Sequence, residues 1–144
     1  MTSERKIVPD NGLAADLHTA PQIHREDSVQ DAIIEEQYAR LVETVRDYNP
    51  AADFVHIESA YHFAKRCHEG QRRKSGEPYI IHPLAVAQIV AEELKLDSES
   101  IEAALLHDCI EDTAATYADI ARLFSPTVAD LVEGVSKLTR IQYA

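Results

Sequence analysis

The chain has 144 residues, which is room for one domain with a moderate apolar core. Its formal charge of −11 argues against a general nucleic-acid binder, because such proteins usually carry a basic face, although a local basic pocket could still hold one small anion. The sequence has no apolar run of about 20 residues, as a membrane span needs, and no apolar segment of a signal peptide at its start, so we expect a cytoplasmic protein. Cys67 and Cys109 match no zinc-ligand spacing or disulfide framework, and we expect both to be reduced and mostly buried.

Residues 1–27 are predicted to form a mobile extension, because they contain prolines and a glycine, mix charges and show no sustained period. The first helix is predicted to follow Ser28, a plausible N-cap, and to end at Asn49-Pro50. Its apolar residues recur at steps of three and four, which indicates one buried stripe: Ile34, Tyr38, Leu41, Val45 and Tyr48.

A second helix is predicted from Phe54 to His68, with Ile57, Tyr61, Ala64 and Cys67 buried. A basic loop follows from Gly70 to Pro78. We expect Pro83 to be the first residue of a third helix. That helix is expected to carry three residues inward: Ala87, Val90 and Leu94.

Asp97-Ser98 is predicted to cap a fourth helix, and Thr116 with Asp119 a short fifth helix. Phe124-Ser-Pro126 ends the fifth, and Thr127 is expected to open a sixth. The apolar stripe of the sixth helix comprises Val128, Leu131, Val132, Val135 and Leu138. No convincing strand is present, so the fold is predicted to be all-α. The final eight residues carry no helix stop signal, and we expect the chain to be a fragment of something longer.

The fourth helix carries His107-Asp108 and Glu111-Asp112 among buried leucines. Burying an imidazole and three carboxylates is costly unless something pairs with them, and a divalent metal ion binds both kinds of group. On one continuous helix, His107 would lie over Glu111 and Asp108 over Asp112. His82, at the start of another helix, could point across the gap between them. A histidine from one helix and a His-Asp pair from another are the skeleton of a metal-hydrolase site in a bundle core.

A simpler interpretation is available for each of these motifs. A His-Asp dipeptide is common and usually forms a hydrogen-bonded surface pair. The other histidines are given no functional role here: His18, His24, His56, His62 and His68.

The second group of interest is basic. The segment from His62 to Pro78 contains five positively charged residues and two negatively charged ones, although the whole chain is acidic. Arginine can bind phosphate with two hydrogen bonds and stack on a base, so the segment suits a phosphate-bearing ligand. The alternative is a solvated loop that balances an acidic surface. The five basic residues are Lys65, Arg66, Arg72, Arg73 and Lys74.

Three segments together resemble the RelA/SpoT family: residues 73–83 (RKSGEPYIIHP), 104–113 (ALLHDCIEDT) and 131–138 (LVEGVSKL). The resemblance is to the amino-terminal HD hydrolase domain of the bifunctional (p)ppGpp synthetase/hydrolases, which act in the stringent response. It covers roughly residues 35–144 at consistent spacing, which makes it much more specific than any single motif.

The resemblance implies an all-helical, Mn²⁺-dependent enzyme that removes the 3′-pyrophosphate from guanosine tetra- or pentaphosphate, giving GDP or GTP and pyrophosphate. It implies His82, His107 and Asp108 as metal ligands. It also implies that Glu111 and Asp112 activate or position the attacking water. Residues expected beside the nucleotide are Arg73, Lys74, Ser75 and Tyr79. Cys109 stands where an aliphatic residue is usual, which we interpret as a core substitution.

The resemblance also implies parts that lie beyond residue 144. These are a fourth metal ligand, an aspartate, and the synthetase and regulatory domains. We therefore expect residues 28–144 to be a partial HD hydrolase domain, incomplete at the carboxy terminus, that contacts neither nucleic acid nor membrane. Two alternatives stay open. One is a generic HD phosphohydrolase with another nucleotide substrate, and the other is a catalytically inert metal- or nucleotide-binding or regulatory module.

Overall fold

The computed structural model describes residues 25–143, with side chains described for residues 28–111 and 113–137. The chain divides into two units, Met1–Ile33 and Ile34–Ala144. Residues 25–33, the described part of the first unit, are helical. The predicted extension of residues 1–27 otherwise lies outside the described residues.

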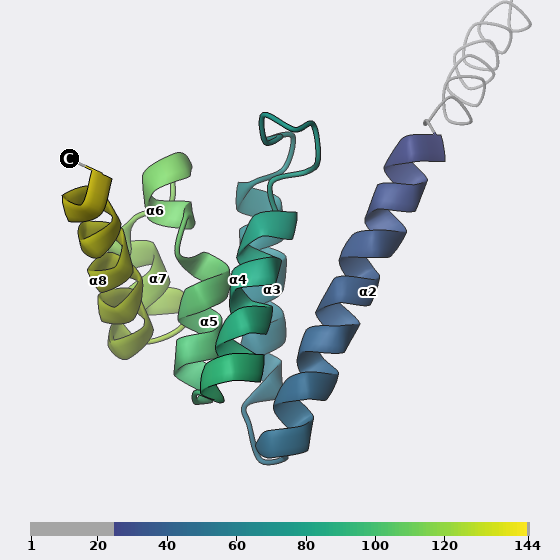
Figure 1. Ribbon diagram of the computed structural model, residues 1–144. Helices are drawn as coiled ribbons and strands as arrows, with labels where there is room; N and C mark the ends of the chain where they lie inside the picture. Colours follow the sequence, from purple (N-terminus) through teal and green to yellow (C-terminus); the bar gives the residue numbers. More distant parts are fainter. Residues whose placement is uncertain (1–24, 144) are drawn as a thin grey trace, which may run out of the picture. The chain divides into compact units, whose positions relative to one another are not determined.

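The described elements are all helical (Figure 1). The one β-type pairing among them is an isolated bridge between Arg72 and Pro78, so the all-α prediction is confirmed. Within residues 25–143, no helix has both the length and the apolar character needed to cross a membrane. The elements are α2 (Arg25–Tyr48), α3 (Phe54–Cys67), α4 (Ile81–Ile89), the π-helical turn η2 (Val90–Leu94), α5 (Ser98–Leu106), α6 (Cys109–Asp112), α7 (Tyr117–Leu123) and α8 (Pro126–Tyr143).

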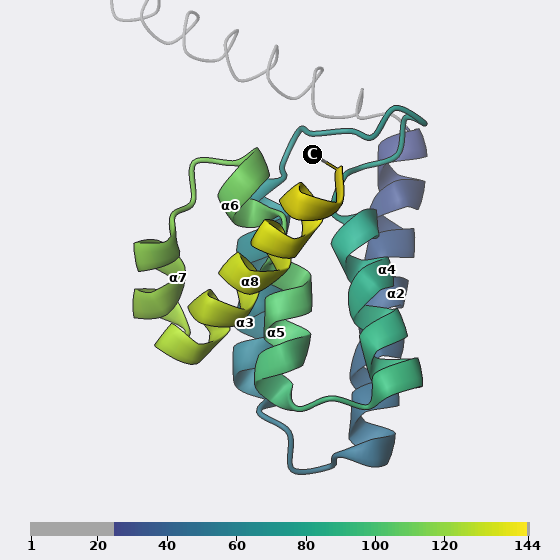
Figure 2. The ribbon, with the colours of Figure 1, turned by 60° about the vertical axis from the view of Figure 1, so that its left-hand side comes forward.

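Helix α5 is the centre of the core. It packs against α3, α4 and α8, and Figure 2 shows α8 passing along one of its sides. All residues from Ile101 to Leu106 are buried, so this helix is enclosed all round rather than amphipathic. Its apolar neighbours include Ile57 on α3, Leu84 on α4 and Val132 on α8. A helix enclosed in this way holds its C-terminal end in a fixed position, and the candidate site begins at that end.

Side-chain caps fix the starts of α5, α7 and α3, and the first two of these caps were predicted from sequence. Asp97 accepts a hydrogen bond from the Ser100 amide at 2.9 Å, as expected for the start of α5. Thr116 and Asp119 form the predicted capping box at the start of α7. Asp53 caps α3 by accepting from the His56 amide at 3.1 Å.

Three predicted helix starts differ from the structure. Ser28 is not an N-cap, because α2 already begins at Arg25. Pro83 is the third residue of α4 rather than the first. The sixth predicted helix starts at Pro126, one residue before Thr127. There the Ser125 hydroxyl accepts from the Val128 amide at 3.0 Å and so caps α8.

Some predicted core positions were also wrong. Leu94 is 60% exposed, because the π-helical turn η2 shifts side chains around the axis and buries Ala91 instead. On α8, Val128 and Val132 are buried as predicted, whereas Leu131 and Val135 are exposed. These two residues line an apolar cleft of about 190 Å³ shared by α4, α5 and α8, so their apolar surface faces a cleft rather than the core. Leu138 lies outside the described side chains.

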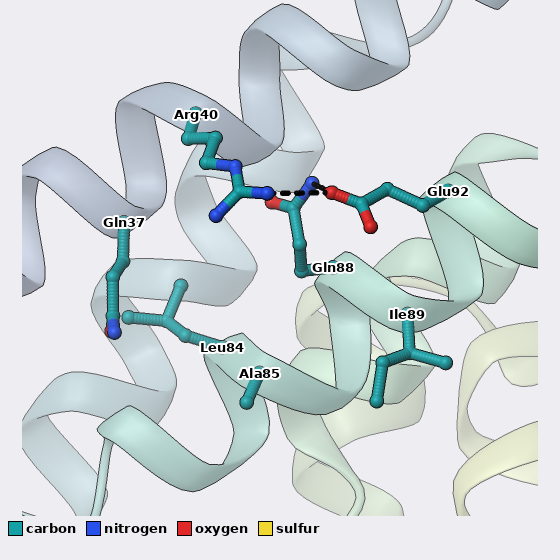
Figure 3. A pocket seen from close by; sticks show the side chains of 7 residues that line it. All are labelled: Gln37, Arg40, Leu84, Ala85, Gln88, Ile89 and Glu92. Carbon is teal, nitrogen blue, oxygen red and sulfur yellow. Dashed lines mark hydrogen bonds and ion pairs between the residues drawn. The ribbon is translucent and has the colours of Figure 1, made fainter.

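Polar side chains join α2 to α4 around a second cavity, of about 280 Å³ (Figure 3). Glu92 Oε1 accepts from Arg40 Nη2 at 3.0 Å and from Gln88 Nε2 at 2.7 Å. Gln88 Nε2 also donates to Thr44 Oγ1 at 2.9 Å. On the same cavity, the buried Oε1 of Gln37 has no hydrogen-bond partner among the described residues. This network fixes the α2–α4 contact, and through it the helix that carries His82.

Candidate metal centre

Two helix ends bring His82, His107 and Asp108 together. His82 is the second residue of α4, while His107 and Asp108 lie between α5 and α6. One potential ligand atom from each residue lies within 4.8 Å of the other two. The chain therefore gathers two imidazoles and a carboxylate, the mixed donor set typical of divalent-metal sites, although the residues come from separate segments.

Asp108 is the point of convergence. Its Oδ2 lies 3.2 Å from His107 Nε2 and 3.5 Å from His82 Nε2. The His107 and Asp108 side chains are 12% and 15% exposed, and that of His82 is 31% exposed. The group is thus largely desolvated on the α5 side and reachable from solvent on the α4 side, as a site open to a ligand requires.

The orientation of His107 supports metal binding. Its Nδ1 lies 2.6 Å from the Ala104 carbonyl oxygen, which can only accept a hydrogen bond, so Nδ1 carries the hydrogen. Nε2 then faces the Asp108 carboxylate, and a positive charge suits the position between them. A histidine that ligates a metal characteristically donates its second N–H to a carbonyl in this way. The three residues present therefore fit a divalent cation.

Asp108 has further polar contacts that keep it ionised. The Tyr79 hydroxyl donates to Oδ2 at 3.0 Å. Burial alone would raise the pKa of this carboxyl, but the adjacent His107 and His82 rings and the hydrogen bond from the Tyr79 hydroxyl outweigh it, so the pKa is lowered. A carboxylate that stays charged in a half-buried position is ready to bind a cation.

The expected continuous helix through both acidic pairs was wrong. Helix α5 ends at Leu106, and α6 is a separate short helix that begins at Cys109. Asp108 has φ −91° and ψ −6°, values of the sparsely populated bridge region where many active-site residues lie. The argument that stacked His107 over Glu111 and Asp108 over Asp112 therefore fails.

The acidic pair lies on α6. Glu111 is exposed and is not one of the three residues grouped within 4.8 Å. The side chain of Asp112 lies outside the described residues. The catalytic roles expected for both residues stay predictions.

The basic loop, residues 70–78, folds as a tight turn between α3 and α4. The Arg73 amide donates to the Glu77 carbonyl at 2.9 Å, and the Gly76 amide donates to the Arg73 carbonyl at 2.8 Å. Gly76 has φ 100°, which favours glycine. Ser75 Oγ donates to the Glu77 carboxylate, and Arg73 Nε lies 3.8 Å from the same oxygen. Arg73, Lys74 and Ser75 are all exposed, whereas Tyr79 reaches Asp108.

The sequence reasoning missed His68. This residue caps the C-terminal end of α3, is 3% exposed and stacks on the Tyr79 ring with a centroid distance of 4.7 Å. No signal in one sequence links it to Asp108, because the contact passes through Tyr79 and a loop. Its place four residues after the buried Ala64, in line with the apolar stripe of α3, was the available hint that it is buried.

The fold and the site define an all-helical domain with a candidate two-histidine, one-aspartate metal centre. Residues 60–144 match the HD domain family, and the chain belongs to that family. It resembles the amino-terminal regions of proteins that make and hydrolyse (p)ppGpp. The bifunctional (p)ppGpp synthase/hydrolase SpoT of Escherichia coli (strain K12) is 52% identical over 106 residues, which cover 74% of this chain and 15% of that protein.

Two further matches agree. A guanosine-3′,5′-bis(diphosphate) 3′-pyrophosphohydrolase of Aquifex aeolicus (strain VF5) is 58% identical over 87 residues, which cover 60% of this chain and 12% of that protein. The solved structure of a metazoan SpoT ortholog that hydrolyzes ppGpp has a TM-score of 0.52 and 36% identity, and the match covers 54% of this chain and 46% of that one. The chain thus spans a small part of the length of its curated relatives.

Proposed function

We propose that this chain is the HD hydrolase part of a (p)ppGpp 3′-pyrophosphohydrolase that acts in the stringent response, with Mn²⁺ as its metal. The observation that carries the proposal is the convergence of His82, His107 and Asp108 on one point, in a chain similar to named hydrolases of this substrate. The proposed hydrolase domain is residues 28–144, and the protein from which it comes would continue into synthetase and regulatory domains.

The proposed roles follow from the geometry. His82, His107 and Asp108 would hold the ion, which when bound activates water and offsets phosphate charge. Tyr79 holds the Asp108 carboxylate by its hydroxyl. Glu111 and Asp112, on the adjoining short helix, would orient the attacking water and accept its proton.

The basic loop would bind the phosphates. Arg73 and Lys74 extend into solvent from a turn that is closed at Gly76, and the same loop continues into Tyr79 beside Asp108. A guanidinium and an ammonium group on one short turn suit a ligand with several phosphates. Ser75 adds a hydroxyl donor on the same turn.

Two other functions predict different measurements. A generic HD phosphohydrolase would hydrolyse other nucleotides as well as ppGpp, and an inert module would bind Mn²⁺ weakly or not at all. The similarity to enzymes named for the guanosine bis(diphosphate) substrate favours the first proposal over both.

The test is pyrophosphate release from ppGpp, pppGpp, GTP and ATP with and without Mn²⁺. It should use the 144-residue chain and a longer form that contains the fourth, aspartate ligand implied by the family resemblance. We expect the longer form to release pyrophosphate from ppGpp and pppGpp only, and only with Mn²⁺. Failure of the longer form on ppGpp would reject the hydrolase proposal, and equal activity on ATP would favour the generic phosphohydrolase.

A further inference from the structure

A continuous chain of side-chain contacts runs from the end of α3 to the candidate metal centre. The His68 ring stacks on the Tyr79 ring at a centroid distance of 4.7 Å and an interplanar angle of 28°. The Tyr79 hydroxyl donates to Asp108 Oδ2 at 3.0 Å. The Tyr79 ring also contacts the His82 ring edge-on, with centroids 5.9 Å apart. Tyr79 thus contacts two of the three residues of the centre, and His68 stacks on its ring.

Polar partners fix the plane of the His68 ring. Its Nδ1 lies 2.7 Å from Gln71 Oε1, an acceptor, so Nδ1 carries the hydrogen. Its Nε2 then accepts, and the Cys109 thiol lies 3.9 Å away, within reach of a weak hydrogen bond. Cys109 directly follows Asp108 in the chain. The imidazole is therefore held on one side by the basic loop and on the other by the residue next to the centre.

Backbone hydrogen bonds also join His68, Gln71 and Tyr79. The Gln71 amide donates to the His68 carbonyl at 2.9 Å, and the Tyr79 amide donates to the Gln71 carbonyl at 2.9 Å. These two hydrogen bonds tie the two ends of the basic loop together. A change at His68 would be passed to Tyr79 through both the ring contact and this backbone.

We propose that His68 is a positioning residue, which holds the Tyr79 ring so that its hydroxyl fixes the Asp108 carboxylate for metal binding. The proposal rests on the metal site of the proposed function and is independent of the nucleotide substrate. It also explains why a histidine, rather than an apolar residue, occupies a position that is 3% exposed: both ring nitrogens have partners there.

The test is a double-mutant cycle on the 144-residue chain with His68→Ala, Tyr79→Phe and both together. The first readout needs no metal: the ¹³C resonance of the Asp108 carboxyl group at a fixed pH. The second is Mn²⁺ affinity by calorimetry. We expect Tyr79→Phe to weaken Mn²⁺ binding by about tenfold, the lower end of the range for outer partners of metal ligands, and His68→Ala to weaken it by less than that.

The decisive result is coupling. If His68 acts through Tyr79, His68→Ala shifts the Asp108 resonance in the parent but not in the Tyr79→Phe background, and the two losses of Mn²⁺ affinity do not add. A purely structural role predicts equal effects in both backgrounds. Such additivity, or an unmoved Asp108 resonance in folded His68→Ala, would overturn the proposal.

Two controls complete the design. His62 lies on the same helix with its side chain 51% exposed, so His62→Ala should leave both readouts unchanged. If His68→Ala does not fold, Gln71→Ala removes the Nδ1 partner instead and should shift the Asp108 resonance in the same direction as Tyr79→Phe. No shift there would equally overturn the proposal. If the parent chain binds no Mn²⁺, its affinity is measured on the longer form with the fourth ligand; if that form binds none either, the metal part of the proposed function fails, while the metal-free resonance still decides the role of His68.

Discussion

The two ends of α5 are built by different means. At the N-terminal end, Asp97 caps the helix by a hydrogen bond to the amide of Ser100, three residues away. At the C-terminal end, the chain leaves the helix at His107 and Asp108, and Asp108 is held by Tyr79, which is 29 residues away. The first end serves the helix itself. At the second end the helix stops, and the Asp108 carboxylate and the His107 imidazole lie beside His82 at the start of α4.

This difference separates stability from binding along one helix. The cap and the buried middle should set the free energy of unfolding, whereas the interrupted end should set metal affinity. Substitutions along α5 can therefore test the comparison one position at a time.

The largest effect is expected in the middle of the helix. Leu105 is fully buried, so Leu105→Ala should lower the free energy of unfolding by about 2–5 kcal/mol through lost burial and the cavity left behind. Urea denaturation measures it. Leu123→Ala is the matched control, because Leu123 is 46% exposed and should cost much less.

At the C-terminal end, Asp108→Ala should reduce Mn²⁺ affinity by more than about 100-fold, since it removes a proposed ligand rather than an outer partner. Hydrolysis by the longer form should be lost with it. The metal-free thermal stability should change little, because the substitution removes no core volume. A collapse of metal-free stability would instead make Asp108 chiefly structural and would erase the contrast between the two ends.

Glu102, on α5, should make the free energy of unfolding depend on pH. This side chain is 3% exposed, and burial raises its pKa to about 7, against about 4.5 in the unfolded chain. Between these values the unfolded state has released the proton while the folded state keeps it, so stability falls as the pH rises from 5 to 8. Glu102→Gln should remove this loss, which we estimate as about 2 kcal/mol after allowing for solvent screening.

Thermal unfolding of parent and Glu102→Gln at pH 5, 6, 7 and 8 measures that effect. Glu93→Gln, the same substitution at an exposed position next to this helix in sequence, is measured in parallel. A stability difference for Glu102→Gln that does not change with pH would mean that the Glu102 carboxyl is charged in the folded protein.

The smallest effect is expected at the N-terminal cap. Asp97→Ala should cost about 1 kcal/mol at pH 7 and leave Mn²⁺ affinity unchanged. Hydrogen bonds from Ser100 lower the pKa of the Asp97 carboxyl, so this stabilisation is present above the unfolded-state pKa and is lost as the pH falls through the folded-state value. Weaker Mn²⁺ binding by this variant would show that the two ends are not independent.

The same contrast explains how much could be predicted from sequence. The caps of α5 and α7 were predicted correctly, because a cap depends on residues within one turn. The interruption at His107 and the π-helical turn at Val90 were not, because apolar periodicity assumes a regular helix and neither feature changes the residue pattern.

For the candidate site, the sequence likewise predicted some features and missed others. The sequence identified His82, His107 and Asp108, which the structure places within 4.8 Å, and their role as metal ligands stays a prediction. It assigned Tyr79 to the nucleotide but could not foresee its hydrogen bond to Asp108, and it gave His68 no role. Both contacts depend on how a loop closes over residues distant in the chain, which a single sequence does not encode locally.

The long sequence separation of these contacts has a consequence for folding. The Tyr79–Asp108 hydrogen bond and the His68–Cys109 contact join residues 29 and 41 positions apart. Such contacts carry the entropy cost of closing long loops before they contribute any stability, whereas helices form from neighbouring residues in microseconds. We therefore expect the individual helices to form before the centre assembles.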